Sequence, residues 1–334
     1  MLLSLDYLLS QSWITFDVAS FIKGFGFATV EGLTFGAIYA LIAVGYTVVY
    51  GVLGLINFAH AGVFVTGCYA LVFTLSALGF SSFPSKKPIF IVLIYVLIAV
   101  FVSILAAAAV AFLVERVAYK PLRKRNAPNL AFLITAIGAS LTISNLFFLR
   151  SPNPEPALSI FTPVPLFKFF GATVTSFNVV TILAAVILMF LVDWFIRRAR
   201  FGRGIRAVAQ DPNTASLVGV NPERVIALTF VLGGVIAGAA SLFYVLKVPS
   251  GVVYNADIVL GLKAFAAAVL GGIGSIRGAL LGGLLLGLFS NWGALLLGNS
   301  QWGDVSVFVL LLLVLLFRPS GILGRSGLSA KSRM

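Results

Sequence analysis

The chain has 334 residues, of which 60% are hydrophobic and only 10% are charged, with a mean hydropathy of +1.09. A soluble domain carries about 25% charged residues because its surface faces water. The composition therefore excludes an ordinary soluble protein and makes the bilayer the main solvent. Cys68 is the only cysteine and His60 the only histidine, which excludes an intrachain disulfide, a Cys-based metal site and a zinc cluster of the usual kind. We expect no metal site.

The net charge of +13 comes from basic residues in short segments between apolar runs. They form no basic helix face and no patch with interleaved aromatic residues, so nucleic-acid binding is not expected. Near the N-terminus, Asp6, Asp17 and the lack of a basic start argue against a cleavable signal peptide. We expect residues 1–26 to form an N-terminal interfacial segment.

Apolar stretches long enough to cross a bilayer recur from residue 27 onward. A helix needs roughly 20 mostly apolar residues to cross about 30 Å of hydrocarbon. Inside lipid the backbone N–H and C=O groups must form their hydrogen bonds within their own segment, as they do in a helix. The apolar runs do not alternate with a period of two residues, which argues against a transmembrane barrel. The sequence therefore predicts an all-α, polytopic transmembrane helix bundle of eight or nine spans. The candidate spans are 27–50, 53–79, 88–114, 129–149, 177–196, 225–246, 257–274, 277–298 and 304–318.

The distribution of Lys and Arg predicts the orientation of these spans, because cytoplasmic loops carry an excess of both. With the N-terminus outside, 16 of the 23 basic residues fall on the cytoplasmic side. They are five residues in 115–128, six in 197–224, Arg277 and four after Phe317. The opposite orientation would place these 16 outside, so we expect an N-out, C-in topology.

This topology divides the chain into a transmembrane permease domain, residues 27–320, and a cytoplasmic basic tail, residues 321–334. Within the domain, residues 197–224 form a cytoplasmic loop. The proline-rich stretch 150–176 is expected to be an ordered but irregular external connection.

Glycine-rich breaks interrupt two separated apolar stretches, at 51–62 and at 261–275. Such breaks are typical of discontinuous helices beside a transport pathway. The residues that we assign as candidates for the pathway or its gate are Asn57, His60, Gly62, Lys263, Gly271 and Gly272.

Polar residues inside a membrane are costly, so they face a cavity or a partner. Asn57 and His60 can line the pathway or its gate, or they can make a structural hydrogen bond or cap. Lys263 can line the pathway, extend outward to the interface, or form an ion pair with Asp257. These alternatives stay open at the level of the sequence.

Two further carboxylates have simpler interpretations. Glu31 is expected at the outer end of a span, where a carboxylate complements the helix N-terminus. Asp193 is expected to pair with Arg197, four residues further along the same helix.

The loop 197–224 is too polar to span the membrane and too patterned for a flexible linker. Asp211 followed by Pro212 predicts an N-capped short helix over 212–218 that ends at Gly219. Asn221, again followed by proline, predicts the start of the next span. A short helix held between two spans is a rigid lever, which can anchor on anionic lipid headgroups or dock on a protein.

Three segments resemble those of the permeases of branched-chain amino acid ABC transporters, the H-type subunit more than the M-type. They occur in the family's order, and the resemblance extends over about residues 27–320. The segments are Asn57-Phe-Ala-His60 with its flanking glycines, the loop from Gly202-Arg203-Gly204 to Arg224-Val-Ile-Ala-Leu-Thr-Phe, and Gly261-Leu-Lys263-Ala-Phe through Gly271-Gly272-Ile-Gly274-Ser275 to Gly278. Ala61 and Arg277 depart from the family, which often has Gly and Pro there.

The resemblance implies a bundle with a discontinuous second helix in the bacterial inner membrane. It also implies a heterodimer with a second homologous permease, two cytoplasmic ATPases and an external solute-binding protein. The chain contains no Gly-x-x-x-x-Gly-Lys-Ser/Thr phosphate loop, so ATP and Mg²⁺ are expected on the ATPases and no cofactor on this chain. The ATPase-coupling residues that the resemblance implies are Gly202, Arg203, Arg206, Asp211, Ala215, Ser216, Gly219 and Asn221.

Three functions compete. An ABC import permease would carry branched-chain or other neutral amino acids, or alternatively urea or short amides. An ion-coupled secondary transporter usually needs acidic or His relay groups deep in the membrane, whereas the carboxylates here are expected at span ends or in loops. A membrane enzyme needs clustered catalytic groups, which one histidine and no paired intramembrane carboxylates do not supply, so we assign no catalytic residue.

Overall fold

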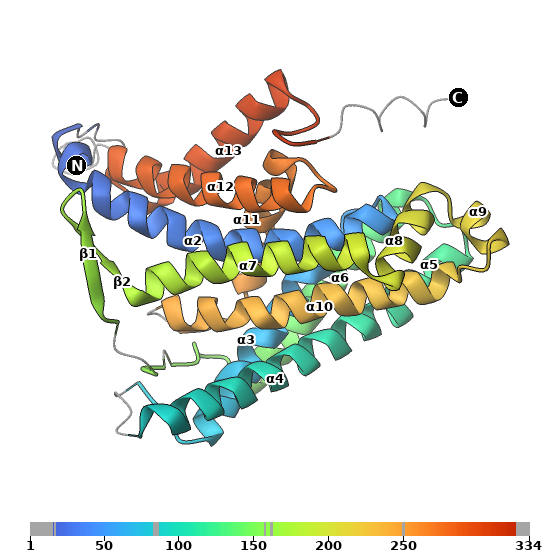
Figure 1. Ribbon diagram of the computed structural model, residues 1–334, viewed down its shortest axis with the longest axis horizontal. Helices are drawn as coiled ribbons and strands as arrows, with labels where there is room; N and C mark the ends of the chain where they lie inside the picture. The colour runs from blue at the N-terminus through green and yellow to red at the C-terminus, as the bar shows by residue number, and fades with distance from the viewer. Residues whose placement is uncertain are drawn as a thin grey trace, which may run out of the picture.

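The computed structural model describes residues 16, 18–82, 87–156, 158–160, 163–248 and 251–324. The helices are α2 (Val18–Leu53), α3 (Ala59–Ala77), α4 (Ile89–Val114), the π-helical turn η1 (Glu115–Tyr119), α5 (Lys120–Lys124), α6 (Asn129–Arg150), α7 (Ser176–Arg198), α8 (Arg200–Gln210), α9 (Pro212–Leu217), α10 (Pro222–Lys247), α11 (Ala256–Gly271), α12 (Ile276–Leu296) and α13 (Ser300–Phe317). The strands are β1 (Pro165–Phe169) and β2 (Ala172–Thr175), and Figure 1 shows the whole arrangement.

The predicted all-α bundle is confirmed, with one correction to the spans. Eight helices of the described chain are long and apolar enough to cross a membrane. The predicted span 257–274, one of the nine candidates, is instead the 16-residue helix α11, which is too short to cross the bilayer because it ends at Gly271 and Gly272. The helix α2 begins at Val18, earlier than the predicted 27, and much of the predicted segments 1–26 and 321–334 lies outside the described residues.

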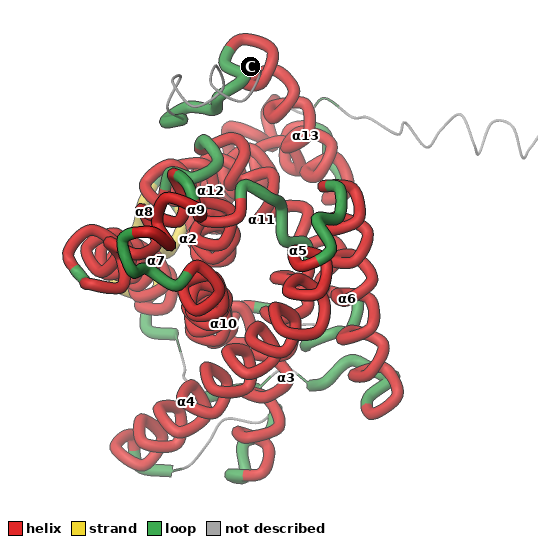
Figure 2. Tube along the Cα trace, turned by 90° about the vertical axis from the view of Figure 1, so that its right-hand side faces the viewer, coloured by secondary structure: helices red, strands yellow, loops and turns green. Residues whose placement is uncertain are grey.

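The helices form an inner and an outer group. The helices α2, α3 and α10 are mostly buried inside the protein, whereas α4, α6, α7 and α13 expose most of their apolar side chains. Seen from the end that carries α8 and α9, the outer helices lie around the edge of the bundle (Figure 2). An apolar outer surface is what lipid or a second membrane subunit covers.

Glycines bring α2 and α12 into direct backbone contact. A Cβ atom on Gly36 would lie 2.8 Å from the carbonyl oxygen of Gly283, and one on Gly283 would lie 2.5 Å from the Cα of Ala40. One turn away, Gly32 and Gly287 meet in the same manner. Small residues at four-residue spacing therefore do here what apolar side chains do in soluble bundles.

The described part of the external connection 150–176 contains a hairpin, so the prediction that this connection is irregular is wrong for residues 165–175. Strands β1 and β2 pair antiparallel through a turn at Phe170 and Gly171, both with positive φ (45° and 80°), the backbone of a tight I′ turn. The turn packs against α2 at Gly26, where any side chain would meet the Phe169 and Phe170 carbonyl groups.

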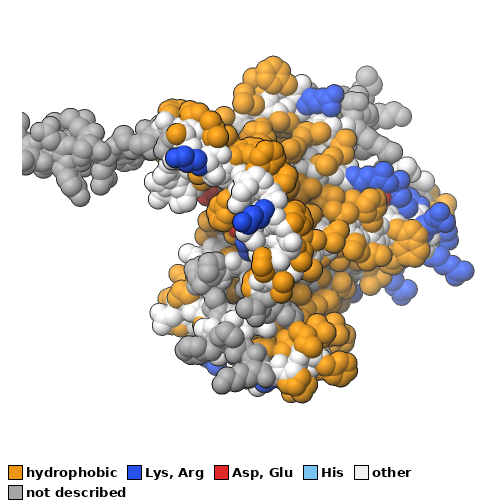
Figure 3. Space-filling view, turned by 60° about the vertical axis from the view of Figure 1, so that its left-hand side comes forward, with side chains coloured by type: hydrophobic (Ala, Val, Ile, Leu, Met, Phe, Trp, Pro, Cys, Tyr) orange, Lys and Arg blue, Asp and Glu red, His pale blue; other side chains and the backbone are white. Residues whose placement is uncertain are grey.

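Both predicted basic segments, 115–128 and 197–224, lie at the end of the bundle that carries α5, α8 and α9 (Figure 1). On the face drawn in Figure 3, most Lys and Arg side chains gather toward this end and the rest of the surface is largely apolar. The two segments thus lie at the same end of the bundle, which is what the predicted orientation requires of them.

Ion pairs connect helices near both ends of the bundle. Asp193 pairs with Arg197 at 2.8 Å, as predicted, and also with Arg277 at 3.1 Å. The expectation for Glu31 is wrong: it lies inside α2, far from the helix start, and its carboxylate pairs with Lys247 of α10 at 2.7 Å. Because α2 begins at Val18, before the apolar run, Glu31 lies more than three turns inside the helix. There its side chain faces α10 and Lys247.

We expect Gly283→Val to destabilise the bundle because the new side chain must push α2 and α12 apart. Overpacking of this kind costs about 1–3 kcal/mol. The measurement is thermal unfolding of the purified protein in detergent. Gly138→Val on α6 is the matched control, since a Cβ there meets nothing within 4 Å; equal shifts in Tm for the two variants would contradict the backbone contact.

Candidate functional site

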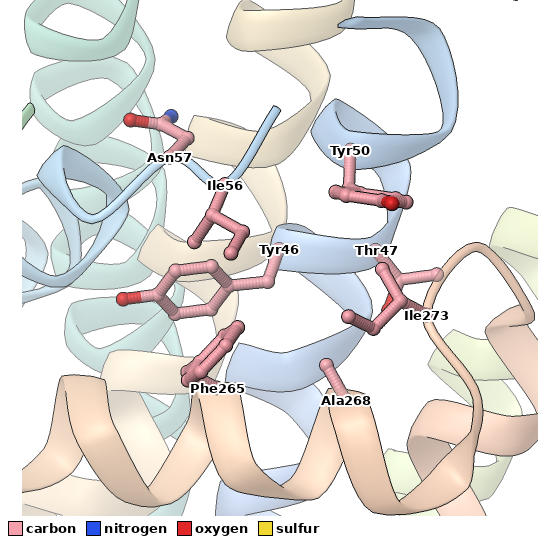
Figure 4. Close-up of a pocket in the computed structure, with 8 residues that line it drawn as sticks. All are labelled: Tyr46, Thr47, Tyr50, Ile56, Asn57, Phe265, Ala268 and Ile273. Carbon is pink, nitrogen blue, oxygen red and sulfur yellow. The ribbon is translucent and has the colours of Figure 1, made fainter. Parts of the chain in front are cut away.

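The two glycine-rich breaks, far apart in sequence, converge on one hollow. It is a small, partly open hollow, with about 230 Å³ of space when the adjoining open solvent is included, and it is lined by Tyr46, Thr47, Tyr50, Ile56, Asn57, Phe265, Ala268 and Ile273. Figure 4 shows Phe265 and Ala268 on α11 below the Tyr46 ring, with Ile56 above it. The hollow lies between the C-terminal half of α2, the turn into α3 and the C-terminal half of α11, so its walls are the segments that the sequence marked as broken helices.

Asn57 lies in the turn between α2 and α3 and has a structural partner. Its side-chain oxygen Oδ1 accepts a hydrogen bond from the Tyr119 hydroxyl at 2.9 Å, and both residues are buried. Tyr119 belongs to η1, so this bond ties the break after α2 to the far end of α4. In Figure 4 the Asn57 amide points away from the Tyr46 ring, while the residue still lines the hollow.

His60 lies in the first turn of α3, buried against α2. Its ring contacts Tyr46 edge-on, with centroids 4.9 Å apart, and lies so close to Gly45 that any side chain there would overlap the imidazole. Gly62, two residues further along α3, faces α6, where an added Cβ would lie 3.1 Å from Ser140. His60 and Gly62 therefore hold α3 against two neighbours and do not line the hollow.

The start of α3 and the middle of α11 touch directly. A Cβ on Gly261 would lie 2.7 Å from that of Ala61 and 3.3 Å from the Tyr46 hydroxyl. The rings of Phe58 and Phe265 pack with centroids 5.2 Å apart. The two broken segments thus share one interface, at which small residues set the separation.

Lys263 is partnered, but not by Asp257. Its ammonium group pairs with Asp304 of α13 at 2.6 Å and lies over the Tyr39 ring at 5.6 Å. A spacing of six residues places Lys263 and Asp257 on different faces of α11, so the predicted pair is wrong.

Gly271 and Gly272 end α11, and the segment after α13 completes that end. Gly272 has φ +105°, which favours glycine. The backbone N–H groups of Ile322 and Leu323 donate to the carbonyl groups of Leu270 and Gly271, both at 2.9 Å. These bonds satisfy carbonyls that a helix end otherwise leaves unpaired.

The predicted short helix in loop 197–224 is confirmed as α9. Asp211 caps it by accepting a hydrogen bond from the Asn213 N–H at 2.9 Å. Hydrogen bonds from the Thr214 hydroxyl and from that N–H hold the pKa of Asp211 below its usual value. Gly219 follows the helix with φ +84°, and Asn221 caps α10 by accepting from the Arg224 N–H at 3.1 Å.

The other coupling candidates divide between α8 and α9. Gly202 is buried against the backbone of Ile196, Ala215 is the buried residue of α9, and Arg203 and Ser216 are exposed. Arg206 donates to the Ile196 carbonyl group. The helix α8 itself was not predicted, although its apolar residues recur at helical spacing around Ile205 and Val208.

The tip of α9 carries apolar side chains that sequence reasoning also missed. Leu217 is 86% exposed and Val218 is 73% exposed. They lie at the basic end of the bundle, where Figure 1 shows α9 projecting beyond the long helices. Exposed aliphatic side chains on a capped helix can contact either another protein or lipid.

The chain matches the family described as branched-chain amino acid transport system / permease component over residues 28–316. It is 42% identical over 301 residues to the high-affinity branched-chain amino acid transport system permease protein BraD of Pseudomonas aeruginosa, covering 89% of this chain and 94% of BraD. It is 41% identical to the corresponding protein LivH of Escherichia coli, covering 88% and 94% of the two chains. A probable LivH of Methanocaldococcus jannaschii is 25% identical, covering 88% and 91%.

We expect Tyr119→Phe to destabilise the protein, because it leaves the buried Asn57 oxygen without its donor. The cost of such an unsatisfied group is about 1–3 kcal/mol, measured as a lower Tm in detergent. The control is Tyr50→Phe, which removes a hydroxyl on the wall of the same hollow that makes no hydrogen bond within the described residues. A Tm of Tyr119→Phe equal to that of the control would argue against the role of this bond.

Proposed function

The chain belongs to the branched-chain amino acid transport permease family, and on this premise we propose that it is the membrane-spanning subunit of an ATP-binding-cassette importer. It is a multi-pass protein of the bacterial inner membrane. The cargo that we propose is branched-chain or other neutral amino acids, delivered by an external solute-binding protein. Urea or a short amide carried by the same machinery is the alternative.

The observation that best supports an externally powered permease is the pair of helices α8 and α9. Asp211, Gly219 and Asn221 fix the two ends of a short connection between long membrane helices. The exposed Leu217 and Val218 give this connection an apolar tip. We infer that it docks on a cytoplasmic ATPase and passes its movement to α7 and α10.

ATP chemistry then belongs to the partners. The sequence contains no phosphate loop, so two ATPase subunits bind ATP and Mg²⁺. A second, homologous permease completes the transport unit as a heterodimer, and the exposed apolar faces of the outer helices are the surfaces available to it and to lipid. The topology is N-out and C-in, which places α9 and the basic end of the bundle in the cytoplasm.

The hollow between α2, α3 and α11 is the part of the pathway that this chain supplies. Its walls include the breaks that follow α2 and α11, and such discontinuous helices are typical of the substrate sites of transporters. Alternating access therefore consists of α3 and α11 separating and closing at the Gly261–Ala61 contact. His60 packs α3 against α2 and Gly62 packs it against α6 in the closed arrangement.

The decisive experiment is uptake into proteoliposomes that contain the permease pair and the ATPases, with the binding protein and ATP supplied. We expect ATP-dependent uptake of leucine and no uptake of urea above the ATP-free control. Uptake of urea without leucine would select the alternative cargo. Transport by the purified chain without any ATPase would overturn the proposal.

We expect Gly219→Val to uncouple ATP hydrolysis from uptake, because a β-branched residue cannot adopt φ +84° without strain. Gly219→Asn is the matched control, since asparagine tolerates this conformation and a Cβ there meets nothing within 4 Å. Asp211→Ala, which removes the cap, should act in the same direction. The measurement is the ratio of solute transported to ATP hydrolysed, with membrane insertion checked separately. A ratio equal to that of the wild type in both Gly219→Val and Asp211→Ala would exclude a coupling role for α9.

A further inference from the structure

Three carboxylates of the described chain are buried, and one of them differs from the other two. Glu115 is paired with Arg123 at 2.5 Å, and Asp193 with two arginines. Asp257, which is only 3% exposed, has no basic partner among the described residues. A buried carboxylate without a compensating charge is unfavourable in an apolar medium. A functional role would explain why Asp257 is buried, whereas the ion pairs of Glu115 and Asp193 explain their burial.

One of the two carboxylate oxygens of Asp257 accepts a hydrogen bond. Ser140 of α6 donates to Oδ2 at 2.7 Å, and the position in the first turn of α11 favours a negative charge. The other oxygen, Oδ1, is buried and accepts no hydrogen bond within the described part of the chain. The structure therefore presents a preorganised carboxylate oxygen that needs a donor.

The surroundings of this oxygen are small and rich in hydroxyl groups. Gly62 lies against Ser140, and no ion pair joins α3 to Asp257 within the described residues. The hydroxyl of Ser144, one turn along the same face of α6, is also buried without a partner. One turn along α11, Gly261 contacts the Tyr46 hydroxyl, and the Tyr46 ring is a wall of the hollow. Asp257 thus lies about two helical turns along α11 from Phe265, the nearest wall residue of the hollow on that helix, with Gly261 and Tyr46 between them.

A ligand that fits this site is singly charged and carries several N–H donors. A primary ammonium has three donors, one for the carboxylate oxygen and others for neighbouring hydroxyl groups. The described chain holds no cluster of three His, Cys, Asp or Glu residues, so a multivalent metal ion lacks the ligands it requires. We propose that Asp257 binds the α-ammonium group of the amino acid in transit, when separation of α3 from α11 opens the hollow toward it. This inference rests on the proposed function.

The first test compares transport by variants in the reconstituted complex with its binding protein. Asp257→Asn keeps the shape and the bond to Ser140 but removes the charge. We expect leucine turnover to fall about 10- to 100-fold, the effect of losing one charge-assisted hydrogen bond, with partial recovery in Asp257→Glu. Asp193→Asn, the same change at a buried carboxylate whose arginines are solvent-exposed, is the control and should keep most of its turnover. Leucine turnover in Asp257→Asn equal to that of the control would overturn the proposal.

The second test separates ligand binding from a structural role. Millimolar leucine should raise the Tm of the complex of permeases and ATPases, purified without its binding protein, because a ligand of the folded state stabilises it. The shift should be absent with 4-methylpentanoate, which is leucine without its ammonium group, and absent in Asp257→Asn. Equal shifts with both compounds, or a shift with sodium chloride or urea in place of leucine, would overturn the inference.

The two failures are distinguishable. If the wild-type complex shows no ATP-dependent leucine uptake, the proposed function fails. If the wild type transports leucine and Asp257→Asn does so equally well, only the role of Asp257 fails.

Discussion

The backbones of α2 and α12 meet where Gly32 and Gly36 face Gly287 and Gly283. Lipid tails are as apolar as the side chains, so the hydrophobic effect contributes little to the association of helices in a membrane. Dispersion contacts between closely approaching helices hold them together instead. The helix α2 also contacts α3, α7, α10 and α11. Every wall of the hollow is therefore positioned, directly or through one neighbour, by a contact that only glycine permits.

Features that depend on neighbouring residues were predictable from the sequence. The apolar runs gave the membrane helices, and Asp211, Pro212 and Gly219 gave α9 with its cap and its end. The glycine-rich breaks correctly marked two segments that end helices. In each case the residues that carry the signal belong to the same stretch of chain as the structure that they predict.

Features that depend on distant residues were not predictable. Lys263 pairs with Asp304 and Glu31 with Lys247, because helix packing, and not sequence spacing, decides which faces meet. The convergence of the two breaks on one hollow, and the burial of Asp257 beside Ser140, likewise require the three-dimensional arrangement. The sequence could place Asp257 at a helix start but could not tell that this start is enclosed by α3 and α6.

The hydrogen bonds from Ile322 and Leu323 to the end of α11 bear on how the chain is assembled during synthesis. The ribosome releases α11 well before these two residues, so the last carbonyl groups of this helix cannot be paired until α12 and α13 have been made. Unpaired carbonyl groups are poorly tolerated in hydrocarbon. The end of α11 is thus complete only once the segment after α13 has docked on it, and a chain truncated before Ile322 would lack the donors for the carbonyl groups of Leu270 and Gly271.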